Sequence, residues 1–377
     1  MPSDSAIRKR KREHLDICVH KGVEFRRKTT WLEDVELVHE ALPDRRLSDV
    51  QTAVTLFKRR LAFPLIIEGM SGGHRAGAAL NRDLAQAAQE AGVGFGVGSQ
   101  RVMLEEPATA RDFEVRNLAP DVPILGNIGI SQVATRDPEE IIRACLRIEA
   151  DALCVHLNPA MELVQREGDR DFSGSEKALR RLVETSPVPV IVKETGCGLS
   201  RETALRLLAN GVRYLDVGGA GGTSWVGVEA QRGTGATKDI GETFWDWGIP
   251  TAASLLEVRG SRFEVIASGG IRNGLEGAKA LALGARVVGV GLPLARAWAA
   301  EGVAGVRRWL KTFQREMTMA VFLAGAGSVA ELGERHAVIT GRLREWGLAR
   351  GLLTSPIYRK TSVRSEIPED SHRRHSS

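Results

Sequence analysis

The sequence predicts an α/β protein, because short apolar runs alternate with longer amphipathic stretches between residues 64 and 290. The apolar runs number eight. Eight strand–helix units close a (β/α)8 barrel, the TIM barrel, which typically takes about 250 residues as one domain. Hydrophobic residues form 43% of the 377-residue chain, enough to build so large a core. We therefore expect a single barrel domain.

The predicted strands are short, and most are rich in β-branched residues. Amphipathic stretches such as 81–91 and 201–210 lie between them, and the second is opened by a Ser200 cap and closed by Gly211. The predicted strands are 64–69, 93–97, 123–127, 152–156, 189–193, 214–217, 264–268 and 286–290.

The rival architecture is the doubly wound dinucleotide-binding fold. Its first strand leads into a GxGxxG turn, with an acidic residue about 20 positions later. Here the first predicted strand leads into Gly69-Met70-Ser71-Gly72-Gly73, which lacks that spacing. The barrel is therefore favoured, and its ligands are expected where the strands end.

Two charged segments flank the barrel. Residues 8–12 read RKRKR, and residues 360–377 are polar with almost no large apolar side chains. We expect 1–60 to form an N-terminal arm with a helical segment that covers the barrel mouth, 61–358 the barrel, and 359–377 a disordered C-terminal tail. The pI near 9.2 owes much to these ends, and no helix-turn-helix or zinc-finger spacing occurs, so no nucleic-acid partner is expected.

The cysteines suggest a location for the protein. They are scattered without CxxC spacing, which favours neither a zinc site nor a disulfide framework. A reducing, cytoplasmic environment fits this usage, and no run of 18 apolar residues occurs, so no membrane partner is expected. The four cysteines are Cys18, Cys145, Cys154 and Cys197.

Glycine-rich segments follow the last three predicted strands. Residues 268–272 read SGGIR, residues 289–293 read GVGLP, and residues 218–223 read GGAGGT. Barrels often place a phosphate after strands seven and eight, where glycine amides and a helix N-terminus point at its oxygens. Arg272 could add a charged contact. The alternative is that these glycines only make tight turns.

Other strand ends carry groups suited to a flavin. Lys193 ends the fifth run and would reach inward toward a ring or an oxyanion. Ser71, Ser99 and Asn127 end three other runs and supply the short hydrogen-bonding groups that the polar edge of a flavin requires. For Ser99 and Asn127 the alternative is ordinary turn chemistry.

A second set of residues suits a diphosphate. Arg101 follows the second run, His156 and Asn158 follow the fourth, and Arg10 and Lys11 would fold over the mouth. The alternative for the basic segment is a solvated arm.

Glu162, six residues after His156, offers a hard oxygen ligand for Mg²⁺. The alternative for this glutamate is a solvent-facing position on its helix.

Together the motifs resemble those of one family, the type 2, FMN-dependent isopentenyl diphosphate isomerases. The resemblance runs from about Arg8 to Tyr358. It rests on segments 10–14 (RKREH), 69–73 (GMSGG), 97–101 (VGSQR), 156–159 (HLNP), 168–172 (GDRDF), 192–194 (VKE), 221–225 (GGTSW), 247–254 (WGIPTAAS) and 268–272 (SGGIR).

The resemblance implies a flavoprotein barrel that interconverts isopentenyl and dimethylallyl diphosphate with FMN and Mg²⁺, NADPH reducing the flavin and no net redox change. It also implies a homo-oligomer, a tetramer or an octamer, and a small-molecule prenyl diphosphate as substrate. By position, FMN would contact Met70, Ser71, Gly72, Ser99, Asn127, Lys193, Thr223, Gly270, Arg272, Gly291 and Leu292. The diphosphate would contact Arg10, Lys11, Ser99, Arg101, His156 and Asn158. The metal would be held by Glu162, and the catalytic positions would be Lys193, His156, Glu229 and Met161.

One position departs from the family pattern near the chemistry. The family has His-Leu-Asn-Pro-x-Gln-Glu, and here the segment reads HLNPAME, so Met161 stands where the glutamine is usual. A thioether neither donates a hydrogen bond nor carries a titrating proton. Either reduced flavin suffices as acid and base, or the activity has changed. A smaller departure is Cys197, which we expect to be a buried structural thiol.

Two positions after the sixth predicted strand are also expected to have roles. Glu229 is expected to orient polar groups, with an exposed helical glutamate as the alternative, and Trp225 is expected to pack as a wall.

Three alternative functions remain open from the sequence. An FMN-dependent 2-hydroxy acid oxidase needs a histidine base after the sixth strand, where residues 216–219 read DVGG. A divergent enzyme acting on another prenyl diphosphate fits the same motifs. Met161 also permits a catalytically silent flavin- or diphosphate-binding protein.

Overall fold

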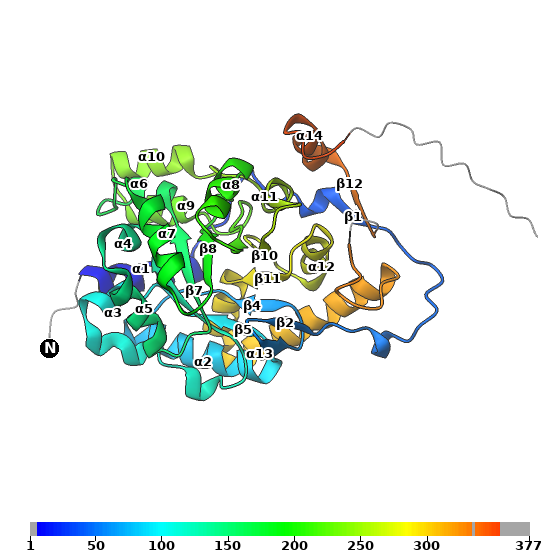
Figure 1. The fold of residues 1–377 in the computed structure, drawn as a ribbon, viewed down its shortest axis with the longest axis horizontal. Coiled ribbons are helices and arrows are strands. Elements are labelled where there is room, and N and C mark those ends of the chain that lie inside the picture. The colour runs from blue at the N-terminus through cyan, green and yellow to red at the C-terminus, as the bar shows by residue number, and fades with distance from the viewer. Residues whose placement is uncertain (1–5, 334–335, 355–377) are drawn as a thin grey trace, which may run out of the picture.

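The computed structural model describes residues 6–333 and 336–354, and its centre is a closed barrel of eight parallel strands (Figure 1). The strands follow one another around the barrel in chain order, and the last pairs with the first through Gly289 and Ile66. All eight predicted strands are confirmed. They are β4 (Leu65–Ile67), β5 (Gly94–Gly96), β6 (Ile124–Gly129), β7 (Ala152–Leu157), β8 (Val190–Glu194), β9 (Tyr214–Asp216), β10 (Glu264–Ser268) and β11 (Val287–Val290).

Helices surround the barrel, and the predicted capping is confirmed for one of them. Ser200 accepts a hydrogen bond from the Thr203 N–H at 3.2 Å, and Gly211 has φ 84° just after the helix. The helices are α1 (Ala6–His20), α2 (Arg75–Ala91), α3 (Arg101–Glu105), α4 (Ile130–Thr135), α5 (Pro138–Arg147), α6 (Pro159–Val164), α7 (Ser175–Thr185), α8 (Arg201–Ala209), α9 (Trp225–Arg232), α10 (Ala236–Phe244), α11 (Thr251–Val258), α12 (Gly274–Ala282), α13 (Leu292–Leu323) and α14 (Gly341–Ala349).

The helix expected over 81–91 begins earlier, at Arg75. Its N-cap is His74, whose side chain accepts from the Gly77 N–H. Histidine is not among the residues that usually cap helices, so no strong start signal is present there.

A two-stranded hairpin closes the end of the barrel where the strands begin. It consists of β2 (Val54–Leu56) and β3 (Arg59–Leu61). Leu56 and Leu61 pack with Ile66 and other inward-facing strand residues, and Arg59 donates to Asp151, just before β7, at 2.6 Å. This hairpin lies mostly within the expected 1–60 arm, and it is at the end of the barrel where the strands begin, not at the mouth that the arm was expected to cover.

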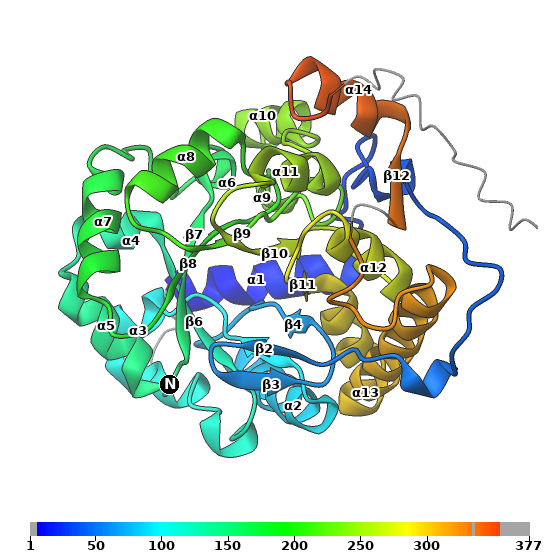
Figure 2. The same cartoon turned by 45° about the vertical axis from the view of Figure 1, so that its right-hand side comes forward.

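The N-terminal helix α1 crosses the other end of the barrel, where the strands finish (Figure 2). After it, β1 (Val35–Leu37) pairs antiparallel with β12 (Ala337–Ile339), which joins the N-terminal segment to the C-terminal one beside α14 (Figure 1). The β1–β12 pair thus ties the N-terminal segment to the C-terminal one, and α1 lies at the mouth of the barrel.

The last long helix, α13, changes direction at Gly302, which has φ 60°. Of the apolar stretch 317–326, Met317 and Val321 are fully buried, whereas Met319 and Leu323 are exposed. This stretch is therefore mainly core.

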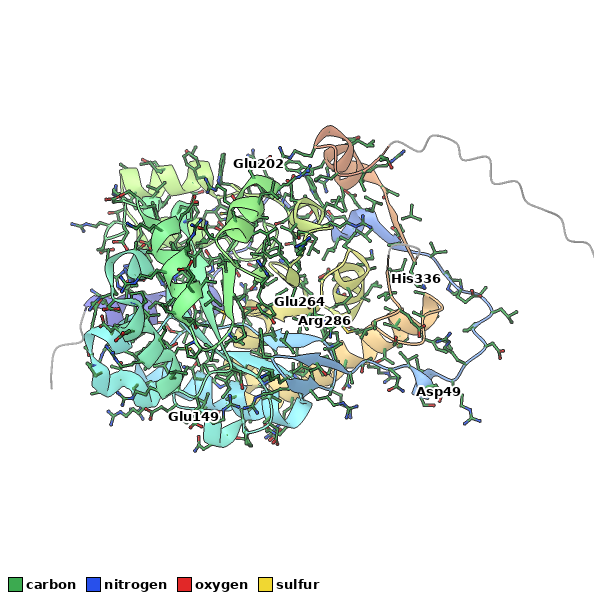
Figure 3. All side chains as sticks on the ribbon, in the orientation of Figure 1. Asp49, Glu149, Glu202, Glu264, Arg286 and His336 are labelled. Atoms are coloured by element: carbon green, nitrogen blue, oxygen red, sulfur yellow. The ribbon has the colours of Figure 1, made fainter. Side chains whose placement is uncertain are left out.

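At the end of the barrel where the strands begin, charged side chains lie on the surface. Figure 3 labels two of them, Glu264 and Arg286, which are 3.8 Å apart. Across the described residues, no helix is long and apolar enough to cross a membrane. The expected tail, 359–377, lies outside the described residues.

Candidate active site

A cavity of about 510 Å³ opens where the barrel strands end. Its walls come from the segments that follow the strands and from Arg10, Lys11 and His14 of α1. The volume and position are those of small-molecule sites in barrel enzymes.

The structure brings nearly all of the predicted site residues into these walls. Gly72 and Glu229 are the exceptions among the described residues. A side chain at Gly72 would meet the Phe113 ring at 2.3 Å, so this glycine allows close packing behind the site. The predicted residues in the walls are Arg10, Lys11, Met70, Ser71, Ser99, Arg101, Asn127, His156, Asn158, Met161, Glu162, Lys193, Thr223, Gly270, Arg272, Gly291 and Leu292.

One side of the cavity is built from backbone. Gly269 and Gly270 have φ of 101° and 77°, which L side chains rarely adopt, and a Cβ at Gly222 would meet the Gly270 nitrogen at 2.3 Å. Arg272 fastens these loops by donating to the carbonyls of Gly270 at 2.9 Å and Gly221 at 3.3 Å. On the same wall α13 begins at Leu292, and the first amide of a helix has no carbonyl partner within it. Glycine amides, a helix N-terminus and an arginine fit a phosphate group.

Beside this wall, the Lys193 ammonium forms an ion pair with Glu68 and lies 3.4 Å from Asp216 Oδ2. All three side chains are nearly or fully buried. Burial alone would lower the pKa of Lys193, but the two carboxylates outweigh it and raise the pKa above its usual range. Lys193 is therefore a fixed cation at the cavity wall.

The residue His156 presents an acceptor, not a cation, to the cavity. Asn127 donates to the Val97 carbonyl at 3.1 Å, so its Oδ1 is the atom 2.9 Å from His156 Nδ1 and must accept from it. Burial, with the nearby Lys193 and Lys11, lowers the pKa of His156 to about 3. The ring is thus neutral, with its Nε2 lone pair free for a ligand proton.

Three cations lie on the side of the cavity that α1 covers: Arg10, Lys11 and Arg101. Lys11 donates to the Ser99 carbonyl at 2.5 Å. Burial, with the neighbouring Arg10 and Arg101, lowers the pKa of Lys11 to about 7. Such a concentration of positive groups in a concave site fits a polyanion.

Glu229 lies just behind this side, on α9, and is fully buried, so the alternative of an exposed helical glutamate is wrong. It accepts from His14 at 2.7 Å and from Arg232 at 2.6 Å. Gln165, with its amide oriented to satisfy both neighbours, donates to Glu229 at 3.1 Å and accepts from Arg10 at 2.7 Å. Burial alone would raise the pKa of Glu229, but His14 and Arg232 together lower it.

Glu162 is also buried, so the alternative of a solvent-facing position is wrong here too. Its two oxygens accept from Asn158 and from the Asp169 N–H, each at 2.9 Å. In the described part of the chain, no group of three or more metal-ligating side chains occurs. A cation at Glu162 would therefore need ligand phosphates and water to complete its shell, which suits Mg²⁺.

Met161 lies in the cavity wall, with its sulfur 3.9 Å from the Asn158 amide nitrogen. The same wall contains Trp225, which makes an edge contact with His14, with ring centroids 5.7 Å apart. Cys197 is half-buried, and burial raises the pKa of its thiol well above the usual range, so it is not a reactive thiolate.

Sequence reasoning missed several acidic and amide groups around the site. Glu68 and Asp216 lie within predicted strands, and a charged residue inside an otherwise apolar strand was the signal available. Gln132, in α4, and Gln165, just after α6, also line the cavity, and no motif marks either of them. Glu194 accepts from the N–H groups of Thr195, Gly196 and Cys197, and burial raises its pKa to about 7.

Comparison with known proteins gives two kinds of similarity. The family model described as FMN-dependent dehydrogenase matches residues 106–339. Curated proteins named isopentenyl-diphosphate delta-isomerase are similar over nearly the whole chain. That of Pyrococcus abyssi is 44% identical over 351 residues, covering 90% of this chain and 95% of the relative. That of Methanothermobacter thermautotrophicus is 43% identical over 357 residues, covering 94% and 100%.

Solved structures add a likeness of fold. A mandelate oxidase variant with (S)-mandelic acid matches with TM-score 0.59 and 21% identity, covering 86% of this chain and 93% of that one. Mandelate oxidase with (S)-2-phenylpropionate matches with TM-score 0.59 and 22% identity, covering 86% and 93%. At this identity the likeness supports the barrel alone.

Proposed function

The chain belongs to the FMN-dependent isopentenyl-diphosphate delta-isomerases, and from this premise we propose that it interconverts isopentenyl and dimethylallyl diphosphate with reduced FMN. The observation that carries the proposal is that one cavity has two anion-binding sides. The glycine loops, Arg272 and the start of α13 form one, and Arg10, Lys11 and Arg101 form the other. One side suits the phosphate of the cofactor and the other the diphosphate of the substrate.

The residues present fit FMN. When bound in its reduced form, the cofactor supplies an electron-rich acid and base, suited to an alkene that ordinary carboxylic acids protonate poorly. Lys193 would hold negative charge at the ring, and the small groups around it would position the polar edge. The residues proposed to hold FMN are Met70, Ser71, Ser99, Asn127, Lys193, Thr223, Gly270, Arg272, Gly291 and Leu292; Gly72 would act through packing.

At the other side, Arg10, Lys11, Ser99, Arg101, Asn158 and His156 would hold the diphosphate. His156 presents a neutral Nε2, so it would share a proton with a phosphate oxygen, and the Asn127 contact at Nδ1 fixes that orientation. Glu162 would bind Mg²⁺ together with substrate oxygens.

Glu229 would act by positioning. It fixes His14 directly and Arg10 through Gln165, and both of these residues line the cavity. Met161 would form an apolar wall, because its thioether cannot transfer a proton. Proton transfer would then not involve the side chain at this position.

Three further features complete the proposal. NADPH would reduce the flavin, and the enzyme would work in the cytoplasm as a tetramer or an octamer. Exposed apolar residues that could lie between subunits include Ile240, Phe244 and Trp247, the last two in ring contact at 5.8 Å.

The test is to incubate the purified protein anaerobically with isopentenyl diphosphate, FMN, Mg²⁺ and NADPH, and to measure dimethylallyl diphosphate. Product formation supports the isomerase, and its absence with the flavin visibly reduced overturns it. Tight binding of FMN and substrate without exchange of substrate protons in D₂O would instead indicate a silent binding protein. Steady oxygen uptake with a 2-hydroxy acid would indicate an oxidase.

A further inference from the structure

The ion cluster beneath the cavity is more elaborate than a single charged wall residue requires. It joins Glu68 just after β4, Lys193 in β8 and Asp216 at the end of β9. Lys193 and Glu68 line the cavity, whereas Asp216 does not and has only 2% of its side chain exposed. Asp216 is therefore a buried carboxylate that no ligand in the cavity touches.

Each carboxylate in this cluster is held from a separate direction. Asp216 Oδ1 accepts from the Ser268 hydroxyl at 2.6 Å and from the Gly218 N–H at 3.2 Å, which leaves Oδ2 to face Lys193. On the other side, a Cβ at Gly289 would lie 2.3 Å from Glu68 Oε1 and 2.9 Å from Ser268 Cβ, so the glycine in β11 leaves room for Glu68. The surrounding strands thus fix both carboxylates around one ammonium.

The geometry has two electrostatic consequences. An ammonium has three N–H donors, and the two carboxylates account for two of them, which leaves one for a ligand in the cavity. Two carboxylates against one ammonium also give the cluster a net negative charge when all three groups are ionised. That charge would oppose further negative charge on a ligand close by.

We propose that Asp216 and Glu68 are positioning residues that hold Lys193 as an oriented cation and, by their excess negative charge, lower the reduction potential of the bound flavin. This inference rests on the proposed binding of FMN. A flavin with a lowered potential is a more electron-rich base once it is reduced, which suits a reaction that uses reduced flavin without net electron transfer.

The test measures the midpoint potential of FMN bound to the full-length protein at pH 8. Asp216→Asn keeps the shape of a side chain that does not touch the cavity and removes one negative charge, while Glu68 still holds Lys193 protonated. We expect the preference for reduced over oxidised FMN to rise about tenfold, which is about 30 mV for a two-electron couple. Glu68→Gln should shift the potential in the same direction.

Two further variants show whether charge is the cause. Lys193→Met should lower the potential. The double variant Glu68→Gln with Asp216→Asn leaves the buried ammonium without a counter-charge, so Lys193 should lose its proton, the cluster should carry no net charge, and the potential should match those of the single carboxylate variants. A purely structural role would not make Lys193→Met and the carboxylate variants shift the potential in opposite directions.

The matched control is Asp151→Asn, which breaks ion pairs with Arg59 and Arg116 at the far end of the barrel. It should lower stability and leave the potential unchanged. This inference is overturned if bound FMN has the same potential in the wild type and in both single variants, or a lower potential in the variants. A wild-type protein that does not bind FMN overturns the proposed function instead. If Asp216→Asn does not fold, Glu68→Gln decides the question by the same criterion.

Discussion

Replacing Glu229 with glutamine should weaken both the fold and substrate binding, although Glu229 is not in the cavity wall. The change leaves His14 and Arg232 facing a neutral amide in a buried site. Removing one partner of a buried ion pair costs about 3–5 kcal/mol. Arg232 keeps a second carboxylate, Glu13 at 3.1 Å, so we expect a loss at or just below the lower end of that range, about 2–3 kcal/mol.

The contribution of Glu229 to stability depends on pH, and the direction of this dependence follows from the shift of its pKa. The pKa of Glu229 is lower in the folded protein than its ordinary value of 4.5, because His14 and Arg232 outweigh burial. The stability from this carboxylate is therefore fully present above about pH 4.5 and is lost as the pH falls through the lower, folded-state pKa. The difference in unfolding free energy between wild type and Glu229→Gln should shrink as the pH falls below about 4.5.

Urea unfolding across this pH series measures the stability term, and steady-state kinetics measures the second effect. Loss of the Glu229–Gln165–Arg10 contacts should raise KM for isopentenyl diphosphate about tenfold. Glu242→Gln is the matched control, because Glu242 pairs with Arg26 at the surface, where such pairs contribute at most about 1 kcal/mol. A Glu229→Gln protein as stable as this control at pH 7, with unchanged KM, would refute the reasoning.

Three other predictions concern the cavity itself. The pKa of Lys11 is about 7 without ligand, so pyrophosphate should bind with proton uptake and its affinity should fall as the pH rises above 7. Calorimetry should show this pH dependence in wild type and not in Lys11→Met. Equal pH profiles of the two proteins would contradict the prediction. Met161→Gln should leave turnover at or below that of wild type, because proton transfer does not involve the side chain at this position. Stopped assays of dimethylallyl diphosphate measure this, and a large gain in turnover would show that the thioether limits the reaction. Gly270→Ala should destabilise the protein by about 1–3 kcal/mol, because φ at this position is 77° and the new Cβ would meet Thr30 at 2.5 Å. The variant should also retain FMN less well on gel filtration. Retention equal to that of wild type would argue against a role of the glycine loops in binding FMN.

The sequence was sufficient for the barrel because its signal is local. Each strand, such as β10 over Glu264–Ser268, is a short apolar run bounded by polar or glycine residues, and the positions directly after the runs became the cavity walls. The start of α2 was missed because His74 replaces the usual capping residue.

The electrostatic partners could not be predicted, because they come from distant parts of the chain. His14 meets Glu229 across 215 residues, and Lys193 meets Glu68 across 125. For both Glu162 and Glu229 the sequence left a solvent-facing position open, because most helical glutamates are exposed, but the N-terminal helix and neighbouring loops bury both. No local pattern indicates which loop will cover a given helix face.

The most direct test of the account is the visible spectrum of the bound flavin during a titration with isopentenyl diphosphate. Because both anion-binding sides belong to one cavity, the protein should retain FMN through gel filtration, and the diphosphate should change the spectrum saturably without releasing the flavin. A spectrum that stays the same while the diphosphate binds, or FMN displaced in proportion to the diphosphate added, would contradict simultaneous binding.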